Sequence, residues 1–350
     1  MSLRRGCSTL ILTGLFGALF CAGLGGMAVI RPPQPADNVA LTYKPLPLSS
    51  ADLKESRVGA LIYRGGLEIN SSDARFGGWS GLLISADGTR LLSQSDEGHW
   101  LRATLTYDKH GNLAGMTGGL LADMEGEDGS KLKAKIEADA EGLAALSDKG
   151  LDGPVAVSFE RDARILHYDT EKSLDAVPTT IPAPDDIKTL DFNSGLEGLT
   201  RITPGTLFAV AETPQVRGND HSAWLIPIPG HKPGARFERL SVKHHDPYEI
   251  SDAAMSPDGR SLYLLERHYF GPLRGVVVAV RRVNIAAVKP GARLDGEEIA
   301  KFTMHENIDN MEGLALRRDA NGKTLLYMIS DDNYNLMLQR TVLLMFEVAG

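Results

Sequence analysis

The feature that most constrains this chain is a unit that recurs five times after Ser50. Each unit has a short apolar run, a turn rich in Gly, Asp or Asn, a second apolar run and then an acidic residue. The units open at Gly81, Glu141, Glu197, Asp252 and Glu312, at spacings of 60, 56, 55 and 60 residues. Such spacings are close to the length of one propeller blade. The repeat therefore predicts a β-propeller.

Turn signals support an all-β chain. The segments SADGTR, SPDGR and DANGK each separate two apolar runs, and Asp-Gly or Asn-Gly between such runs is typical of β-hairpins. The best helical candidate, EDGSKLKAKIEADAEGLAAL, can equally be read as two strands. We expect a sixth blade from Arg57–Ser71, which would pair with RTVLLMFEV near the C-terminus and close the ring. The prediction is a six-bladed β-propeller in one domain, residues 52–350. A β-sandwich or two barrels would not explain the regular period.

The N-terminus has the layout of a secretory signal. Arg4 and Arg5 precede an apolar segment from Leu10 to Leu24, and small residues follow as far as Ala28. We expect residues 1–28 to be a signal peptide, or else an uncleaved anchor that provides the only membrane contact. Residues 29–51 are rich in proline and predict an extended linker. The expected location is periplasmic or secreted.

Charge and cysteine usage exclude several functions. The formal net charge is −8 without a basic stripe, which argues against a nucleic-acid partner. Both cysteines, Cys7 and Cys21, lie in the leader, so the exported chain would lack a thiol nucleophile and a cysteine metal site. No Gly-x-Ser-x-Gly elbow surrounds any serine, so the usual signature of a serine esterase is missing.

The acids at the ends of the apolar runs should converge in a propeller. The first strand of each blade lines the central channel, so we expect Glu141, Glu197 and Glu312 to form a ring, with Asp252 at the equivalent place in its blade. The second strand returns antiparallel, and its last residue lies beside the start of the first. The acids that end second strands should therefore lie at the same mouth: Asp96, Glu160, Glu212, Glu266, Asp331 and Asp332.

Converging carboxylates repel one another unless they protonate or share a cation. Ca²⁺ fits best, because it takes six to eight oxygen ligands in a flexible geometry. The expected metal ligands are Glu141, Glu197, Asp252, Glu312, Asp331, Asp332 and Asn333. Zinc and copper fit less well, because no histidine pair has ligand spacing beside these acids. The alternative is structural: the same acids would bond backbone N–H groups and join the blades.

The expected catalytic residues are Glu312 and Asp331. A bound phosphate or carboxylate would need cationic donors, for which Arg75, Arg161 and Arg267 are candidates. His245, in HHDPYEISD, is a further candidate for contact with the substrate. Arg161 and Arg267 directly follow acids, so the alternative for both is an ion pair with a neighbouring carboxylate.

Four segments carry a resemblance to a known family: RFGGWSGL, NSGLEGLT, DNMEGLA and SDDNYN. They resemble the phytase-like proteins, an exported bacterial family named for an esterase-like activity of phytase, and the resemblance extends from Tyr63 to Val348. It implies a propeller fold and a relation to calcium-dependent propeller phytases. It implies the fold better than it implies the substrate.

We therefore expect an exported Ca²⁺-dependent hydrolase that acts on a small-molecule ester or phosphoester at the mouth of the channel. A first alternative, from another class, is a non-catalytic envelope propeller that binds a ligand or a protein partner, since fold alone does not determine function. Its site would lie on loops near His221 or Tyr269. A second alternative is a Ca²⁺-dependent lactonase.

Overall fold

The structure is a computed structural model that describes residues 36–216, 220–231, 234, 236–271 and 274–349. The expected signal peptide or anchor, residues 1–28, lies outside the described residues. Of the helices in the described ranges, none has the length and apolar character needed to cross a membrane.

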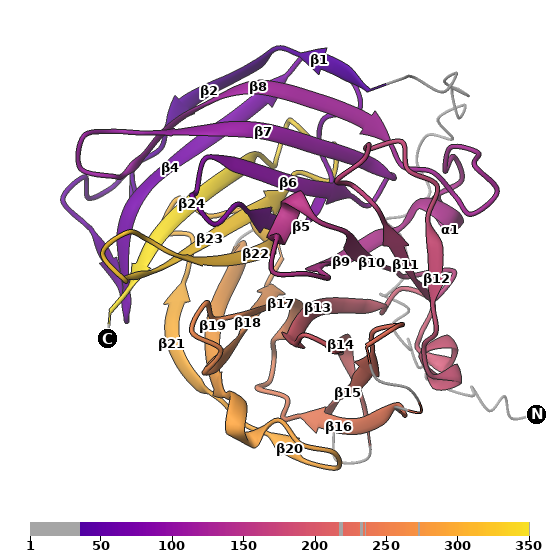
Figure 1. Cartoon of the computed structure of the whole chain (residues 1–350). Coiled ribbons are helices and arrows are strands. Elements are labelled where there is room, and N and C mark those ends of the chain that lie inside the picture. Colours follow the sequence, from indigo (N-terminus) through magenta and orange to yellow (C-terminus); the bar gives the residue numbers. More distant parts are fainter. Residues whose placement is uncertain (1–35, 217–219, 232–233, 235, 272–273, 350) are drawn as a thin grey trace, which may run out of the picture. The chain divides into compact units, whose positions relative to one another are not determined.

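Most of the described chain is strand, arranged as blades around a centre (Figure 1). Blade 1 contains β5 (Trp79–Ile84), β6 (Arg90–Ser95), β7 (His99–Tyr107) and β8 (Leu113–Asp123), with β1 (Asp37–Val39) at its outer edge. Blade 2 contains β9 (Ala140–Ala145), β10 (Val155–Phe159), β11 (Arg164–Tyr168) and β12 (Thr179–Ile181). Blade 3 contains β13 (Leu196–Thr203), β14 (Thr206–Val216), β15 (Asp220–Pro227), β16 (Glu238–Val242) and β20 (Arg293–Leu294).

The last two blades and the short helices complete the domain. Blade 4 contains β17 (Glu249–Met255), β18 (Ser261–Tyr269), β19 (Val276–Asn284) and β21 (Glu297–Phe302). Blade 5 contains β22 (Asn310–Arg318), β23 (Thr324–Asp331), β24 (Thr341–Val348), β4 (Leu61–Ser71) and β2 (Leu41–Pro45), and β3 (Arg57–Val58) pairs with β4. The helices are α1 (Lys135–Ala138) and three 3₁₀ turns, Gly150–Asp152, Asp185–Thr189 and Ile285–Ala287. The helical candidate of the sequence thus divides into α1 and β9.

The prediction of a propeller is confirmed, but the prediction of six blades is wrong, because the described strands form five sheets. The segment Arg57–Ser71 supplies mainly one long strand, β4, which pairs with β24 and joins blade 5. A segment with one long strand cannot build a blade of its own. The expected pairing of Arg57–Ser71 with the C-terminal strand is nevertheless present, so strands from both ends of the chain close the ring.

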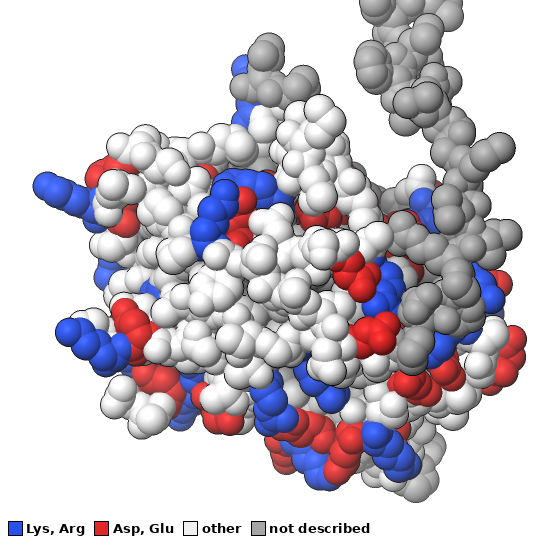
Figure 2. Space-filling model, turned by 90° about the horizontal axis from the view of Figure 1, so that it is seen from above, with Lys and Arg blue, Asp and Glu red and all other residues white. Residues whose placement is uncertain are grey.

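The predicted linker, residues 29–51, is corrected by two strands. β1 pairs with β8 of blade 1, and β2 pairs with β4 of blade 5, so the propeller begins at Asp37 rather than at residue 52. Both strands cover edges that would otherwise expose unpaired backbone groups. A proline-rich segment suits an edge strand, because its outer side needs no backbone donor. Figure 2 shows this side of the molecule, where charged side chains lie mainly towards the margins and uncharged side chains cover much of the middle.

Glycines let the inner strands pack closely around the centre. A Cβ atom on Gly142 would lie 2.7 Å from the carbonyl oxygen of Glu197, and one on Gly198 would lie 3.0 Å from the Cβ of Ala253. These glycines follow the opening acids of the Glu-Gly-Leu units. Their missing side chains allow neighbouring blades to meet, and the apolar cores lie between the blades.

Two segments that carry the family resemblance meet where the last blade contacts the first. Asp332 Oδ1 accepts hydrogen bonds from the backbone N–H groups of Gly78 and Tyr334, at 3.2 and 3.0 Å. Gly78 has φ +67°, and a Cβ there would overlap the Asp96 carboxylate and lie 2.8 Å from the Tyr334 ring. Glycine is required at this point, and we call the contact between Gly78, Asp332 and Tyr334 the closure clamp.

Candidate functional site

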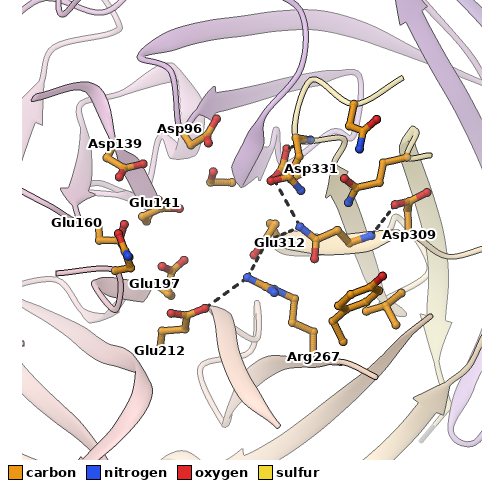
Figure 3. Close-up of a pocket in the computed structure, with 18 of the residues that line it drawn as sticks. Asp96, Asp139, Glu141, Glu160, Glu197, Glu212, Arg267, Asp309, Glu312 and Asp331 are labelled. Carbon is orange, nitrogen blue, oxygen red and sulfur yellow. Dashed lines mark hydrogen bonds and ion pairs between the residues drawn. The ribbon is translucent and has the colours of Figure 1, made fainter. Parts of the chain in front are cut away.

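A cavity of about 900 Å³ opens at the end of the channel where the inner strands begin. Nine carboxylic side chains line it: Asp96, Asp139, Glu141, Glu160, Glu197, Glu212, Asp309, Glu312 and Asp331. Three cationic side chains also line it: Lys135, Arg161 and Arg267. Figure 3 shows that these carboxylates come from several blades and point into one space. The predicted convergence of acids at one mouth is therefore present.

A β-bulge in every blade directs one residue of the inner strand into this region. In blade 3, for example, Leu196 pairs with Ala211 and Gly198 with Val210, which leaves Glu197 as the extra residue. Such an extra residue leaves the ladder and re-aims its side chain. The equivalent residues of the five blades are Ser80, Glu141, Glu197, Ser251 and Glu312.

This register corrects the alignment of blade 4 by one residue. Ser251 occupies the position of the ring acids, and Asp252 takes the place of the following glycine. The Asp252 carboxylate is buried and accepts backbone hydrogen bonds from Ala253 and Leu314, at 2.7 and 2.6 Å. Asp252 thus joins the inner strands of blades 4 and 5, and it does not line the cavity.

The second strands supply another ring of residues, which lie opposite the bulges of the inner strands. Its members are Asp96, Glu160, Glu212, Arg267 and Asp331. In the second strand, each of them directly follows the residue that pairs with the inner strand just before the bulge. In blade 4 this position belongs to Arg267, one residue after the expected Glu266. Glu266 is buried outside the cavity in an ion pair with Arg281. Blade 4 therefore contributes a serine and an arginine where blades 2, 3 and 5 contribute two acids.

Carboxylates crowd together on the side of blades 2 and 3. One oxygen each from Glu160, Glu197 and Glu212 lie within 4.8 Å of one another, and the same holds for Asp139, Glu141 and Glu160. Asp139 is already bound on both oxygens, by Lys135 Nζ at 2.6 Å and by Arg161 Nε at 2.6 Å. We call Glu160, Glu197 and Glu212 the acid triad, because these three are the better placed to share an ion.

Burial and mutual repulsion make ionisation of these groups costly. Burial, with the nearby charges of Asp139 and Glu212, raises the pKa of Glu160 to about 8. Burial raises the pKa of Glu212 to about 7, although Arg267 opposes this shift. The pKa values of Glu141 and Glu197 are raised well above the usual range, again by burial first and by neighbouring acids second. Without a cation, these carboxylates hold their protons to higher pH than ordinary carboxylates do.

The side of blades 4 and 5 differs, because its acids have partners. Arg267 Nη2 lies 3.0 Å from Glu312 and 3.4 Å from Glu212. Asn310 Nδ2 donates to Glu312 Oε1 at 2.8 Å, and the backbone N–H of Asn333 donates to Asp331 Oδ1 at 2.6 Å. Figure 3 shows Arg267 between Glu212 and Glu312. These contacts hold the acids of this side in fixed positions.

Comparison with known proteins identifies the family. Residues 74–334 match the family model of phytase-like proteins, described as esterase-like activity of phytase. The chain belongs to the phytase-like family. Membership suggests hydrolase-type activity. None of the curated proteins matches the sequence. One solved structure, the crystal structure of RRP9 WD40 repeats, is 10% identical with a TM-score of 0.37, and the match covers 84% of this chain and 100% of that one.

Several predicted site residues of this phytase-like protein do line the cavity. They are Glu141, Glu197, Glu312, Asp331, Asn333, Arg161 and Arg267. Asp332 instead bonds Gly78 and Tyr334 through Oδ1 and accepts a hydrogen bond from Thr341 on Oδ2 at 2.8 Å. Asp331 ends β23 and Asp332 directly follows it, and the two carboxylates have different partners.

Two predicted substrate contacts lie elsewhere in the phytase-like fold. Arg75 is nearly buried against Asp73 and Asp37, at 2.8 and 3.2 Å, and pins β1 to the blade-1 side. His245 Nε2 lies 2.9 Å from Asp295. His221, considered as a loop residue, is fully buried, with Nδ1 3.2 Å from the Ala211 carbonyl oxygen. None of the three lines the cavity.

The sequence did not reveal every lining residue. The clearest omissions are Lys135, Asp139, Asp309 and Asn310. Asp139 and Asn310 each stand two residues before the bulged glutamate of their blade, at Glu141 and Glu312. The same face is reached every second residue of a strand, so this spacing was an available signal. Lys135 lies on α1, which no repeat pattern predicts.

The donors of this phytase-like site fit a hard cation. Ca²⁺ binds oxygen at 2.3–2.6 Å, so one ion can reach three oxygens that lie within 4.8 Å of one another. Two further carboxylate oxygens, Asp96 Oδ1 and Glu312 Oε2, are buried without a hydrogen-bond partner among the described residues. Such groups are costly unless something satisfies them. No cysteine or histidine lines the described cavity, which disfavours zinc and copper.

Proposed function

We propose that this phytase-like propeller is a metal-dependent hydrolase of ester bonds, with Ca²⁺ as the expected ion and the cavity at the channel mouth as the active site. The observation that carries the proposal is the acid triad: three carboxylates whose oxygens lie within 4.8 Å of one another. Since burial already raises the pKa values of these groups, an ion in place of the protons relieves their repulsion.

Glu160, Glu197 and Glu212 would hold the ion. When bound, it would act as a Lewis acid that polarises the carbonyl or phosphoryl oxygen of the ester. Arg267 keeps Glu212 and Glu312 in place through the ion pairs at 3.4 and 3.0 Å. A preorganised site of this kind needs little rearrangement as charge develops during the reaction.

The residues proposed for proton transfer are Asp331 and Glu312. Burial, with the charges of Asp96 and Glu312, raises the pKa of Asp331 well above its usual range. Once it is ionised, a carboxylate with a raised pKa is the stronger general base, since it accepts a proton from an attacking water more readily. Asn310 orients both acids, with Nδ2 at 2.8 Å from Glu312 and 3.5 Å from Asp331.

The cellular location of the protein would determine which substrates reach it. The N-terminal leader supports export, so the proposed site of action is the periplasm or the exterior of the cell. The proposed substrate is a small ester or phosphoester that enters through the open mouth of the channel.

The test is hydrolysis with controlled metal content. The protein is stripped with EDTA, reloaded with Ca²⁺, and assayed with p-nitrophenyl butyrate, p-nitrophenyl phosphate and a γ-lactone. We expect turnover of at least one ester that EDTA abolishes, that Ca²⁺ restores and that Glu197→Gln reduces at least 100-fold. Bound Ca²⁺ without turnover of any ester would instead favour the non-catalytic binding protein, and turnover of the lactone alone would favour the lactonase.

A further inference from the structure

One wall of the cavity is apolar, whereas a phosphate-binding site requires charged or polar groups. Tyr269, Val276, Met304 and Leu338 line it beside the charged residues. Three of these side chains are strongly exposed although they are large and apolar: Tyr269 at 59%, Met304 at 56% and Leu338 at 81%. Exposed apolar groups gathered at the mouth of a cavity indicate a contact surface for a ligand.

Three separate segments of blades 4 and 5 build this wall. Tyr269 and Val276 pair across the β18–β19 hairpin. Met304 lies in the turn after β21, and Leu338 lies in the turn between β23 and β24. Gly275 lets Met304 approach the hairpin, because a Cβ at Gly275 would lie 2.5 Å from Met304 Cγ. This contact positions Met304, and the wall is part of the same cavity as the acid triad.

The charges of the cavity disfavour a polyanionic ligand. Nine carboxylic and three cationic side chains line it, so an excess of 9 − 3 = 6 negative charges remains when all are ionised. All three cations already pair with acids: Lys135 with Asp96 and Asp139, Arg161 with Asp139, and Arg267 with Glu212 and Glu312. Protons on the acids with raised pKa values and one bound divalent ion reduce this excess, but the described lining offers no unpaired cationic side chain, and a ligand with several phosphates needs such donors.

We infer that the substrate is an uncharged carboxylic ester or lactone whose alkyl or aryl group packs against Tyr269, Met304 and Leu338, rather than a multiply phosphorylated compound. This inference rests on the proposed ester hydrolysis. The reacting carbonyl lies towards the acid triad, and the apolar group lies over blades 4 and 5.

A chain-length series tests the wall. We expect kcat/KM of the Ca²⁺-loaded protein to rise about two- to fourfold per methylene from p-nitrophenyl acetate to the hexanoate, because each buried methylene favours binding. Inositol hexakisphosphate should be hydrolysed far more slowly. The double variant Met304→Ser/Leu338→Ser should flatten the series.

The matched control is Met337→Ser. Met337 is 94% exposed and adjacent to Leu338, but it does not line the cavity, so the series should keep its slope. A flat series in the unmodified protein, an unchanged slope in the double variant, or preferred hydrolysis of inositol hexakisphosphate would overturn the inference.

Failure of the proposed hydrolysis can be separated from failure of the wall. If no ester is turned over, binding of 2-butanone, 2-hexanone and 2-octanone, which resemble esters but cannot be hydrolysed, is measured by saturation-transfer NMR. Affinity that grows with chain length, and that the double variant removes, supports the apolar subsite alone. Affinity that is independent of chain length overturns it.

Discussion

The two sides of the cavity use the same repeat position for different purposes. On blades 2 and 3, Glu160, Glu197 and Glu212 crowd within 4.8 Å. On blades 4 and 5, Arg267 stands at the position that corresponds to Glu160 and Glu212, and it pairs with Glu312 at 3.0 Å and with Glu212, at the edge of the triad, at 3.4 Å. A single exchange of acid for arginine divides one ring into a side suited to a cation and a side held by ion pairs.

The difference shows that the number of acids in a repeat does not by itself determine which of them bind a metal ion. A carboxylate with a permanent cationic partner gains little from an added ion, whereas one that faces only other carboxylates gains much. The sharpest experiments therefore treat the two sides separately.

The largest effect on stability is expected from Arg267→Leu, which removes the cation from the paired side. Glu212 and Glu312 would lose their partner in a largely buried setting, and such losses destabilise by about 3–5 kcal/mol. Urea unfolding in EDTA measures this. The control is Arg282→Leu, which breaks an exposed pair with Glu297 in the same blade and should cost at most about 1 kcal/mol. Equal losses in the two variants would contradict the proposed role of Arg267.

Metal affinity should separate the sides next. We expect Glu197→Gln to weaken Ca²⁺ binding by about 100-fold or more, because it removes a ligand of the acid triad, whereas Glu312→Gln should weaken it by less than about tenfold. Isothermal titration calorimetry with EDTA-stripped protein measures both. A larger loss in Glu312→Gln would move the metal centre to the paired side.

The pH dependence of the metal-free protein should report the acid triad. Burial, aided by nearby acids, raises the pKa of Glu160 to about 8, and burial raises that of Glu212 to about 7. The folded protein therefore binds more protons than the unfolded chain between about pH 4.5 and 8, and its stability falls as the pH rises through this window. We expect Tm in EDTA to drop by several degrees from pH 5 to 8.

Saturating Ca²⁺ should remove most of that drop, because the ion replaces the protons and binds only the folded state. The double variant Glu160→Gln/Glu212→Gln should have a smaller pH dependence in EDTA than the unmodified protein. A Tm that does not change with pH in the unmodified, metal-free protein would argue against the crowding of these acids.

The smallest effect on metal binding is expected at Asp332, next to Asp331 in the sequence. Asp332→Asn should change Ca²⁺ affinity by less than about twofold, since its carboxylate is engaged by Gly78, Tyr334 and Thr341. It should lower Tm, because it weakens the closure clamp. Calorimetric titration and thermal unfolding of the same sample separate the two effects.

The sequence was sufficient for the fold class and for much of the site. The period predicted a propeller, and the Glu-Gly-Leu openings correctly placed Glu141, Glu197 and Glu312 at one mouth. The blade count was wrong because Arg57–Ser71 resembles two strands, and only pairing with β24 shows that it belongs to blade 5. The pairing itself was predicted, but the pattern of apolar runs does not show that this segment adds one strand to the last blade instead of forming a blade of its own.

The errors within blade 4 have one cause. Ile-Ser-Asp aligns with Leu-Glu-Gly, so Asp252 falls on the glycine position, and an acid nearby was mistaken for an acid in register. One residue decides whether a side chain enters the channel or points into the packing between blades. The sequence period locates a bulge only to within one residue. The direction of the side chain, into the channel or away from it, depends on that one residue.

The closure clamp and the last blade determine at which stage of synthesis the site can form. The chain is synthesised from its N-terminus, so β4, which pairs with β2 on one side, must wait for its other partner until β24 has been made. Until then blade 5 is incomplete, and Asp332 of the clamp lacks the hydrogen bond that Thr341 donates. The acids of blade 5 would join those of blades 2 and 3 only at that last step, so a chain truncated before Thr341 has the whole acid triad and no completed site.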